Sequence, residues 1–437
     1  MPLLLFINTT LPDCARDTKP VQKRGCKCFT REISVQNPRT FWANAMKIGL
    51  FFLVIGYLLS QFYRSFLAVL AGLLRTDIGV SADDLAFSSG LWFLVFALMQ
   101  LPVGWALDRF GPRRTTALML GIGGTGGAML FAAAQSALHV HLAMALLGIG
   151  CAPVLMASYY IFARSFPPVV FATLAGAVIG FGSLGNILGA LPMAWAAEVI
   201  GWRESLLLVA GINALVAVVL WRVIPDPPPA TAPDGAPGSL LDLLRIPALW
   251  LLIPLLIVNY APAAGLRGLW AGPFYADLYG ASASGIGQVT LLMALAMIAG
   301  NFAYGPLDRL FGTRKGVILV GNLCGTVCLG ALWLFPLSGF WQTGFLLAGV
   351  GFFGASFPMM MAHGRSFFPP HLTGRGVTLL NLFSIGGVGV LQTLSGRIHA
   401  IAPAAPPEAA YQALFAFFGL LLLIGCVIYA FSEDRTD

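Results

Sequence analysis

Residues 104–114 read Gly-Trp-Ala-Leu-Asp-Arg-Phe-Gly-Pro-Arg-Arg, and residues 305–315 read Gly-Pro-Leu-Asp-Arg-Leu-Phe-Gly-Thr-Arg-Lys, a degenerate copy of the first stretch. A second motif is also repeated, as Arg-Ser-Phe-Pro-Pro at 164–168 and Arg-Ser-Phe-Phe-Pro-Pro at 365–370. Internal self-similarity of this kind indicates two structural units of the same design. A shift of about 200 residues therefore aligns the two halves of the chain.

The composition is that of a membrane protein. The chain has 437 residues, of which 58% are apolar and only 10% are charged, against about 25% charged in a soluble domain. The apolar runs are unbroken and long enough to cross a hydrocarbon core of roughly 30 Å as helices. We predict twelve spans, at residues 47–74, 85–107, 115–135, 140–163, 169–195, 204–224, 247–276, 284–307, 316–336, 339–362, 376–398 and 410–431.

The basic residues lie mostly on one side of the predicted spans. The other side carries only Arg75, Arg203 and Arg397. Because Lys and Arg accumulate in cytoplasmic loops, both termini are expected in the cytoplasm. The net charge of +7 is explained by this topology, so no nucleic-acid partner is expected. The Cys26-Lys-Cys28 spacing is too short for a zinc site, and no metal is expected.

The predicted domain organisation has two bundles joined by a linker rich in proline and glycine. The first 45 residues are basic and aperiodic, which predicts a disordered cytoplasmic tail; the alternative is that translation begins at Met46. We expect a tail at 1–45, a six-helix bundle at 46–224, a cytoplasmic linker at 225–246, a second six-helix bundle at 247–431 and a short cytoplasmic tail at 432–437.

The Gly-x-x-x-Asp-Arg-x-Gly-x-Arg-Arg run resembles the signature loop of the major facilitator superfamily, and residues 46–431 fit its layout of six plus six spans. The second copy departs from the pattern, because Asp308 comes one residue early and Phe311 is extra. The resemblance implies an all-α membrane protein of two pseudo-symmetric bundles, a multi-pass monomer in a bacterial cytoplasmic membrane.

The signature loops are expected to form a conformational gate. The resemblance implies that Asp108 and Arg109 favour the outward-facing state by pairing across the bundle interface. The simpler interpretation is that these arginines only set topology. The predicted gate residues are Gly104, Asp108, Arg109, Gly111, Arg113, Arg114, Asp308 and Arg309.

Two arginines stand inside long apolar spans, Arg64 in the first and Arg267 in the seventh. A guanidinium at this depth costs roughly 2.5–3.5 kcal/mol on insertion scales. Arg64 and Arg267 occupy nearly the same place in the two halves, and the resemblance implies that these two spans line a central cavity. The alternative is that both side chains extend to the membrane surface. We predict an anion-binding site formed by the two arginines.

Helical spacing adds neighbours to each arginine. Tyr57, Ser60 and Gln61 share a face with Arg64, and that polar stripe should face a water-filled cavity. Candidate substrate-binding residues are Arg64, Arg267, Tyr57, Gln61, Tyr260, Trp270, Tyr159, Tyr160 and Asn381. Asn186, Gln288, Ser384 and His363 are weaker candidates, because such groups also pack helices.

The predicted function is secondary transport of a small anionic substrate by alternating access. No acidic residue stands in the interior of a predicted span, so coupling to a proton or to a counter-anion remains open. Alternatives are an efflux pump for a drug or siderophore-like compound, and a membrane sensor or assembly partner that does not transport. No nucleophile and base motif or phosphate loop indicates an enzyme, and no cofactor is expected.

Overall fold

The computed structural model describes the backbone of residues 38–165, 177–224, 243–368, 373–403 and 406–435, with the single positions 174 and 226. Every regular element in these ranges is a helix. The first half of the chain contains α2 (Pro38–Phe62), α3 (Leu67–Ile78), α4 (Ala82–Leu98), α5 (Gln100–Met119), the π-helix η1 (Leu120–Thr125), α6 (Gly126–Ala132), α7 (Ala137–Ser165), α9 (Leu184–Leu188), α10 (Leu191–Val199) and α11 (Trp202–Val223).

The second half is also entirely helical in its described residues. It contains α13 (Pro247–Asn259), α14 (Ala261–Gly265), the π-helix η2 (Leu266–Trp270), α15 (Ala271–Tyr279), α16 (Ala283–Phe311), α17 (Arg314–Leu334), α18 (Phe340–Gly354), α19 (Phe357–Arg365), α20 (Thr373–Ile401) and α21 (Ala409–Tyr429).

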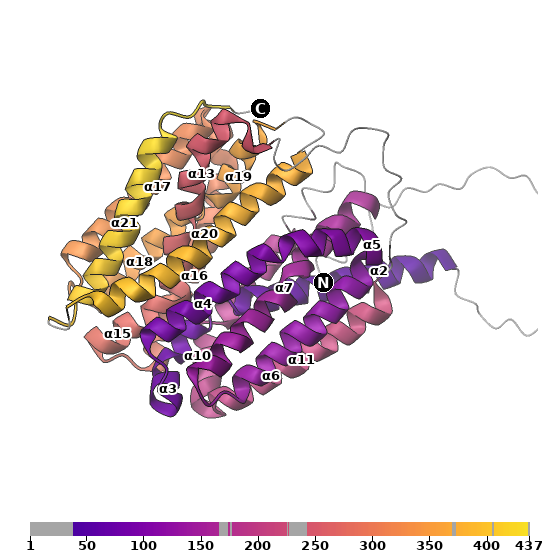
Figure 1. Cartoon of the computed structure of the whole chain (residues 1–437), viewed down its shortest axis with the longest axis horizontal. Coiled ribbons are helices and arrows are strands. Elements are labelled where there is room, and N and C mark those ends of the chain that lie inside the picture. Colours follow the sequence, from indigo (N-terminus) through magenta and orange to yellow (C-terminus); the bar gives the residue numbers. More distant parts are fainter. Residues whose placement is uncertain are drawn as a thin grey trace, which may run out of the picture.

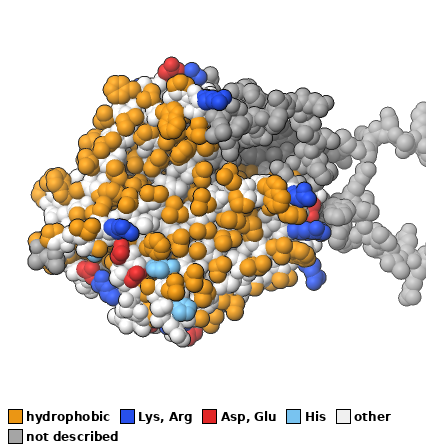
Figure 2. Space-filling model, in the orientation of Figure 1, with side chains coloured by type: hydrophobic (Ala, Val, Ile, Leu, Met, Phe, Trp, Pro, Cys, Tyr) orange, Lys and Arg blue, Asp and Glu red, His pale blue; other side chains and the backbone are white. Residues whose placement is uncertain are grey.

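The expectation of twelve spans is confirmed. In the part of the chain that the structure describes, eleven helices are long and apolar enough to cross a membrane, and the bent pair of α2 and α3, counted as one span, makes twelve. On the face drawn in Figure 2, hydrophobic side chains cover the middle of the molecule, and charged side chains gather toward its ends. A wide apolar belt between charged ends is the surface that a bilayer requires.

Helix α2 begins earlier than the sequence predicted. Its first residue is Pro38, so residues 38–45 are helical where we expected the end of a disordered tail. Proline suits the first position of a helix because its missing N–H would have no partner there. The helix therefore starts before the predicted first span and runs into it without a break. The rest of the expected tail lies outside the described residues.

The first signature loop kinks α5 and divides it into two helical segments at Gly111. Gly111 has φ +80° and ψ 167° inside this element, and Pro112 follows it. A positive φ costs glycine no steric strain, and proline starts the next helical segment. Residues up to Phe110 therefore close the second span, and those after Gly111 open the third.

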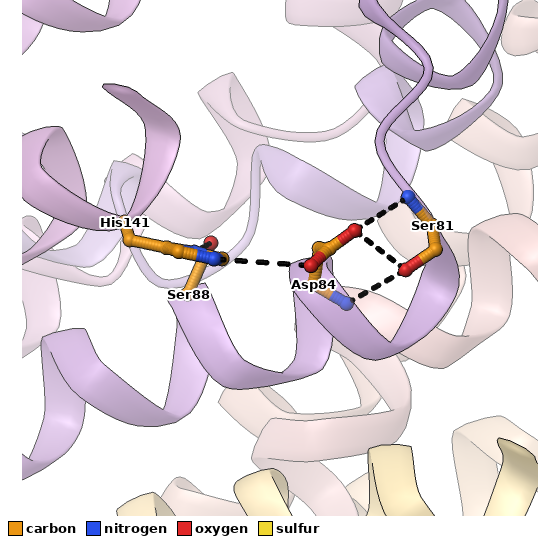
Figure 3. A network of polar contacts seen from close by, with 4 residues as sticks. All are labelled: Ser81, Asp84, Ser88 and His141. Carbon is orange, nitrogen blue, oxygen red and sulfur yellow. Dashed lines mark hydrogen bonds and ion pairs between the residues drawn. The ribbon is translucent and has the colours of Figure 1, made fainter. Parts of the chain in front are cut away.

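The start of α4 is fixed by a polar network that also reaches α7 (Figure 3). Ser81 and Asp84 form a capping box, in which the Ser81 Oγ accepts from the Asp84 N–H. His141 of α7 bonds the Ser88 hydroxyl through Nδ1 at 2.7 Å, and its Nε2 lies 3.8 Å from the Asp84 carboxylate. These contacts provide hydrogen-bond partners for backbone N–H groups in the first turn of α4 and connect α4 to α7 within the bundle.

The two bundles meet at one end. Helix α4 packs along α20, α10 along α16 and α3 along α15, and Figure 1 shows the bundles separating toward α5 and α19. Glycines allow the closest approach: a Cβ on Gly90 would lie 2.7 Å from the Gly389 carbonyl oxygen. We call the joined end the α3/α15 end and the opposite one the α5/α19 end.

Candidate functional site

Arg64 lies at the break between α2 and α3. The two helix segments are bent by 54°, and Tyr63, Arg64 and Ser65 form turns between them. The Arg64 side chain is only 8% exposed. Its guanidinium carbon is 5.0 Å from the ring centroids of both Trp92 and Phe96. Aromatic faces stabilise a cation by about 0.5–2 kcal/mol, so α4 holds this charge in place.

Arg267 lies at the corresponding irregularity of the seventh span, in the π-helix η2. Short π-helical turns inside α-helices are frequent at functional sites. The Arg267 side chain is completely buried. Among the described residues, its Nε, Nη1 and Nη2 atoms make no hydrogen bond of standard geometry, and the group beside the guanidinium is the neutral Tyr260 hydroxyl. A buried charge without a compensating anion is costly, and an anionic ligand would remove that cost.

The two irregular segments touch each other through their backbones. A Cβ on Gly268 would lie 2.3 Å from the Arg64 carbonyl oxygen, and one on Gly272 would lie 1.8 Å from the Ala68 carbonyl oxygen. Only glycine permits helices to approach this closely. Arg64 and Arg267 therefore flank the crossing of the first and seventh spans, and each charge acts on the other.

Three more predicted residues join this cluster. Gln61 Nε2 donates to the Tyr57 hydroxyl at 3.0 Å, and the phenol of Tyr57 lies within electrostatic reach of Arg64 and Tyr260. The Tyr260 phenol lies beside the Arg267 guanidinium. We call Tyr57, Gln61, Arg64, Tyr260 and Arg267 the arginine cluster. Helical spacing on two separate spans was enough to select all five.

The remaining predicted lining residues fare differently. Tyr159 lies close to Tyr57, whereas Tyr160 and Asn381 are half-buried on α7 and α20 and stay predictions. Trp270 contacts α20 in this conformation, and its place in the substrate site stays a prediction. Its indole N–H donates to the Ser395 hydroxyl at 2.8 Å, and its ring stacks on His399 of α20, so the wider π-helical turn directs it toward α20.

The two arginines are shielded from solvent in this conformation. Arg64 and Arg267 are both buried, and Tyr57 on the polar stripe of the first span is 5% exposed. The close backbone contact of the two spans covers one side of the site, and the expected water-filled cavity stays a prediction. The described site is thus enclosed at the α3/α15 end.

Two polar contacts between the bundles close this end, and the sequence did not single them out. Arg75 of α3 pairs with Asp277 of α15 at 2.9 Å, and Tyr411 also donates to Asp277. Glu198 at the end of α10 accepts from the Ser284 N–H in the first turn of α16 at 3.0 Å. The signal was present, because Arg75 and Asp277 follow Arg64 and Arg267 at almost equal spacing.

The first signature loop is held within its own bundle. The Arg113 N–H donates to Asp226 Oδ1 at 3.0 Å, and Arg113 Nε lies 3.2 Å from Oδ2. The Arg109 guanidinium lies 5.9 Å from the Trp105 ring, and a Cβ at Gly104 would meet no atom within 4 Å.

The second signature loop is held by an acidic residue in the same way. Asp434, which follows α21, accepts from the Lys315 N–H at 2.9 Å and from the Thr313 hydroxyl. These bonds outweigh burial and hold the pKa of the Asp434 carboxyl below its usual value. Each loop is therefore fixed by an acid that follows the last helix of the same bundle. The side chains of Asp108, Asp308 and Arg309 lie outside the described residues, so the predicted gate stays a prediction.

His363 fits the packing role that the sequence favoured. Its Nδ1 is 2.6 Å from the Tyr429 hydroxyl and its Nε2 is 2.9 Å from the Glu433 carbonyl oxygen. Both ring nitrogens thus hold the end of α21 and the segment after it against α19.

The sequence is similar to a transporter family and to individual transporters. The family model of the Major Facilitator Superfamily matches residues 53–270 and 261–437. An uncharacterized transporter, YybO of Bacillus subtilis, is 23% identical over 407 residues, which cover 86% of this chain and 91% of the relative. The D-galactonate transporter of Escherichia coli O6:H1 is 25% identical over 187 residues, 42% of this chain and 41% of the relative.

Solved structures share the fold. A bacterial homologue of the human lysosomal transporter Spinster, in an inward-facing and occupied conformation, has a TM-score of 0.71 at 18% identity, with 88% of this chain and 96% of that chain covered. A D-xylose–proton symporter has a TM-score of 0.72 at 13% identity, with 88% and 97% covered. The chain belongs to the major facilitator superfamily and is a multi-pass membrane transporter, not an enzyme.

Proposed function

We propose that this protein moves a small organic anion across the bacterial cytoplasmic membrane by alternating access, as a monomer, with Arg64 and Arg267 as the ligands of the anion. The observation that carries the proposal is the state of Arg267. Its guanidinium is fully buried, and among the described residues its three nitrogen atoms make no hydrogen bond of standard geometry and face no carboxylate. Its planar donor fork matches a carboxylate or a phosphate.

The surroundings of the two arginines also favour an anion. No acidic side chain of the described residues pairs with either of them, whereas Asp277 and Asp226 are engaged with Arg75 and Arg113. The site therefore carries uncompensated positive charge, which would repel a cation. That one relative is a D-galactonate transporter agrees with an organic acid as the class of substrate.

We further propose that the α3/α15 end faces the outside of the cell. The opposite end carries Arg113, Arg114 and Arg222, and basic residues favour the cytoplasmic side. With that orientation, the contact of α3 with α15 closes the outer end, and the conformation is inward-facing. Transport would then require the bundles to rock about the arginine cluster, driven by a proton or a counter-anion.

A binding screen tests the sign of the ligand. Purified protein should be stabilised against thermal unfolding by one or more small carboxylates or phosphate esters, and not by matched neutral amides or amines. A ligand at about 100 times its Kd raises the free energy of unfolding by roughly 2.7 kcal/mol, which a thermal shift assay detects. Stabilisation by amines alone would overturn the proposed substrate class.

A further inference from the structure

A groove lies on the flank of the first bundle, between α11 and the stretch in which the end of α5 runs on into η1; these two stretches pack side by side. It accommodates about 390 Å³ and includes none of the arginine cluster. It is lined by Ala117, Gly121, Thr125, Ala214, Ala217, Val218, Trp221 and Arg222. The lining is mostly apolar, and the groove opens on the outer surface of the bundle, where Val218 and Trp221 are exposed.

The hollow results from small residues on both walls. A Cβ on Gly121 would touch only the Ala217 Cβ, at 3.6 Å, so this position opens toward the groove. Its neighbours in the glycine-rich run 121–127 behave differently: a Cβ on Gly123 would lie 2.6 Å from the Gly150 N atom of α7. Helix packing accounts for Gly123, but it does not account for the absence of a side chain at Gly121.

Positive charge gathers at one end of the groove. Arg222 is part of its lining in the last turn of α11. Arg114 precedes Ala117 by three residues and Gly121 by seven, which places it on the same helical stripe. Both arginines are exposed. The acid described nearby, Asp226, is already paired with Arg113, so neither charge is neutralised by it.

We propose that this groove binds an anionic phospholipid, with an acyl chain along the small-residue walls and the phosphate between Arg222 and Arg114. A guanidinium binds phosphate oxygens through paired N–H donors, and basic pockets between membrane helices on the cytoplasmic side suit acidic headgroups. The apolar walls favour a lipid over free phosphate, and the two cations favour an acidic headgroup over a zwitterionic one.

Native mass spectrometry of the detergent-purified protein tests the proposal. Wild type should retain phosphatidylglycerol more tightly than phosphatidylcholine with the same acyl chains. Each of Arg222→Ala and Arg114→Ala should weaken phosphatidylglycerol binding about fivefold, since an arginine near an acidic lipid surface contributes about that factor. Gly121→Leu should fill the groove and weaken both lipids. Arg365→Ala, an exposed arginine of the other bundle, should leave both unchanged.

Three results would overturn it. One is equal retention of the two lipids by wild type, which would mean that the headgroup is not recognised. Another is an unchanged affinity in Gly121→Leu, which would place the lipid elsewhere. The third is displacement of bound phosphatidylglycerol by inorganic phosphate as effectively as by added phosphatidylglycerol, which would mean that the acyl chain is not recognised. Melting temperatures measured without added lipid distinguish a variant that has lost the site from one that is misfolded. If Arg222→Ala or Gly121→Leu melts at a lower temperature than wild type, the measurement is repeated with Arg222→Gln or Gly121→Val.

Discussion

Arg267→Met is expected to make the ligand-free protein more stable and to abolish transport. The wild-type guanidinium is fully buried with no carboxylate and no hydrogen bond of standard geometry among the described residues, and replacing buried charge by an apolar side chain of similar length stabilises proteins by about 1–4 kcal/mol. Loss of a buried charged contact to the substrate costs about 2–5 kcal/mol, so affinity should fall about 30-fold or more. Thermal unfolding and uptake into proteoliposomes measure the two effects.

The matched control is Arg64→Met. It should also lose transport, but it should gain no stability, because its guanidinium already rests against Trp92 and Phe96 and the aromatic contacts are lost with it. Arg267→Lys should lose most activity as well, since an ammonium cannot form the paired contact. If Arg267→Met unfolds at a lower temperature than wild type and still transports, Arg267 is a structural residue and the proposed site is wrong.

Much of this architecture can be predicted from the sequence, because apolar runs, internal repeats and helical spacing are regular patterns. Apolar length predicts the spans, the repeat predicts two bundles, and the spacing of Tyr57, Gln61 and Arg64 predicts one face of a helix. All of these depend on regular geometry, which holds along most of the chain. The five members of the arginine cluster were identified this way.

The sequence says less about irregular helices and about contacts between the bundles. The turn at Arg64 and the π-helix at Arg267 alter which residues share a face, and Trp270 bonds Ser395 in this conformation. Contacts between the bundles, such as Arg75 with Asp277, depend on tertiary placement and on the conformational state. Their almost equal spacing from the two arginines marks Arg75 and Asp277 as related positions, but it does not show that they form an ion pair. The two breaks lie at equivalent places, in the region where we propose the site.

Gly272→Ala is expected to prevent closure of the α3/α15 end. The added Cβ would lie 1.8 Å from the Ala68 carbonyl oxygen, a backbone atom that cannot move without shifting α3. Overpacking of this kind costs about 1–3 kcal/mol, whereas the exposed pair Arg75–Asp277 contributes only about 0–1 kcal/mol and could not compensate. The conformational equilibrium should therefore shift toward a state that is open at this end, and transport should stop.

Distances between spin labels at Thr76 on α3 and Leu278 on α15 measure this shift, and the Gly272→Ala distribution should move to longer values. Gly72→Ala is the matched control, since a Cβ there meets no atom within 4 Å and alanine is the better helix former; it should keep the wild-type distances and rate. The salt bridge alone explains closure if Gly272→Ala behaves as wild type while Asp277→Asn opens this end. If the glycine contact controls closure, Gly272→Ala should open this end more than Asp277→Asn does. The reason is that the steric penalty of the added Cβ exceeds the stabilisation from a solvent-exposed ion pair.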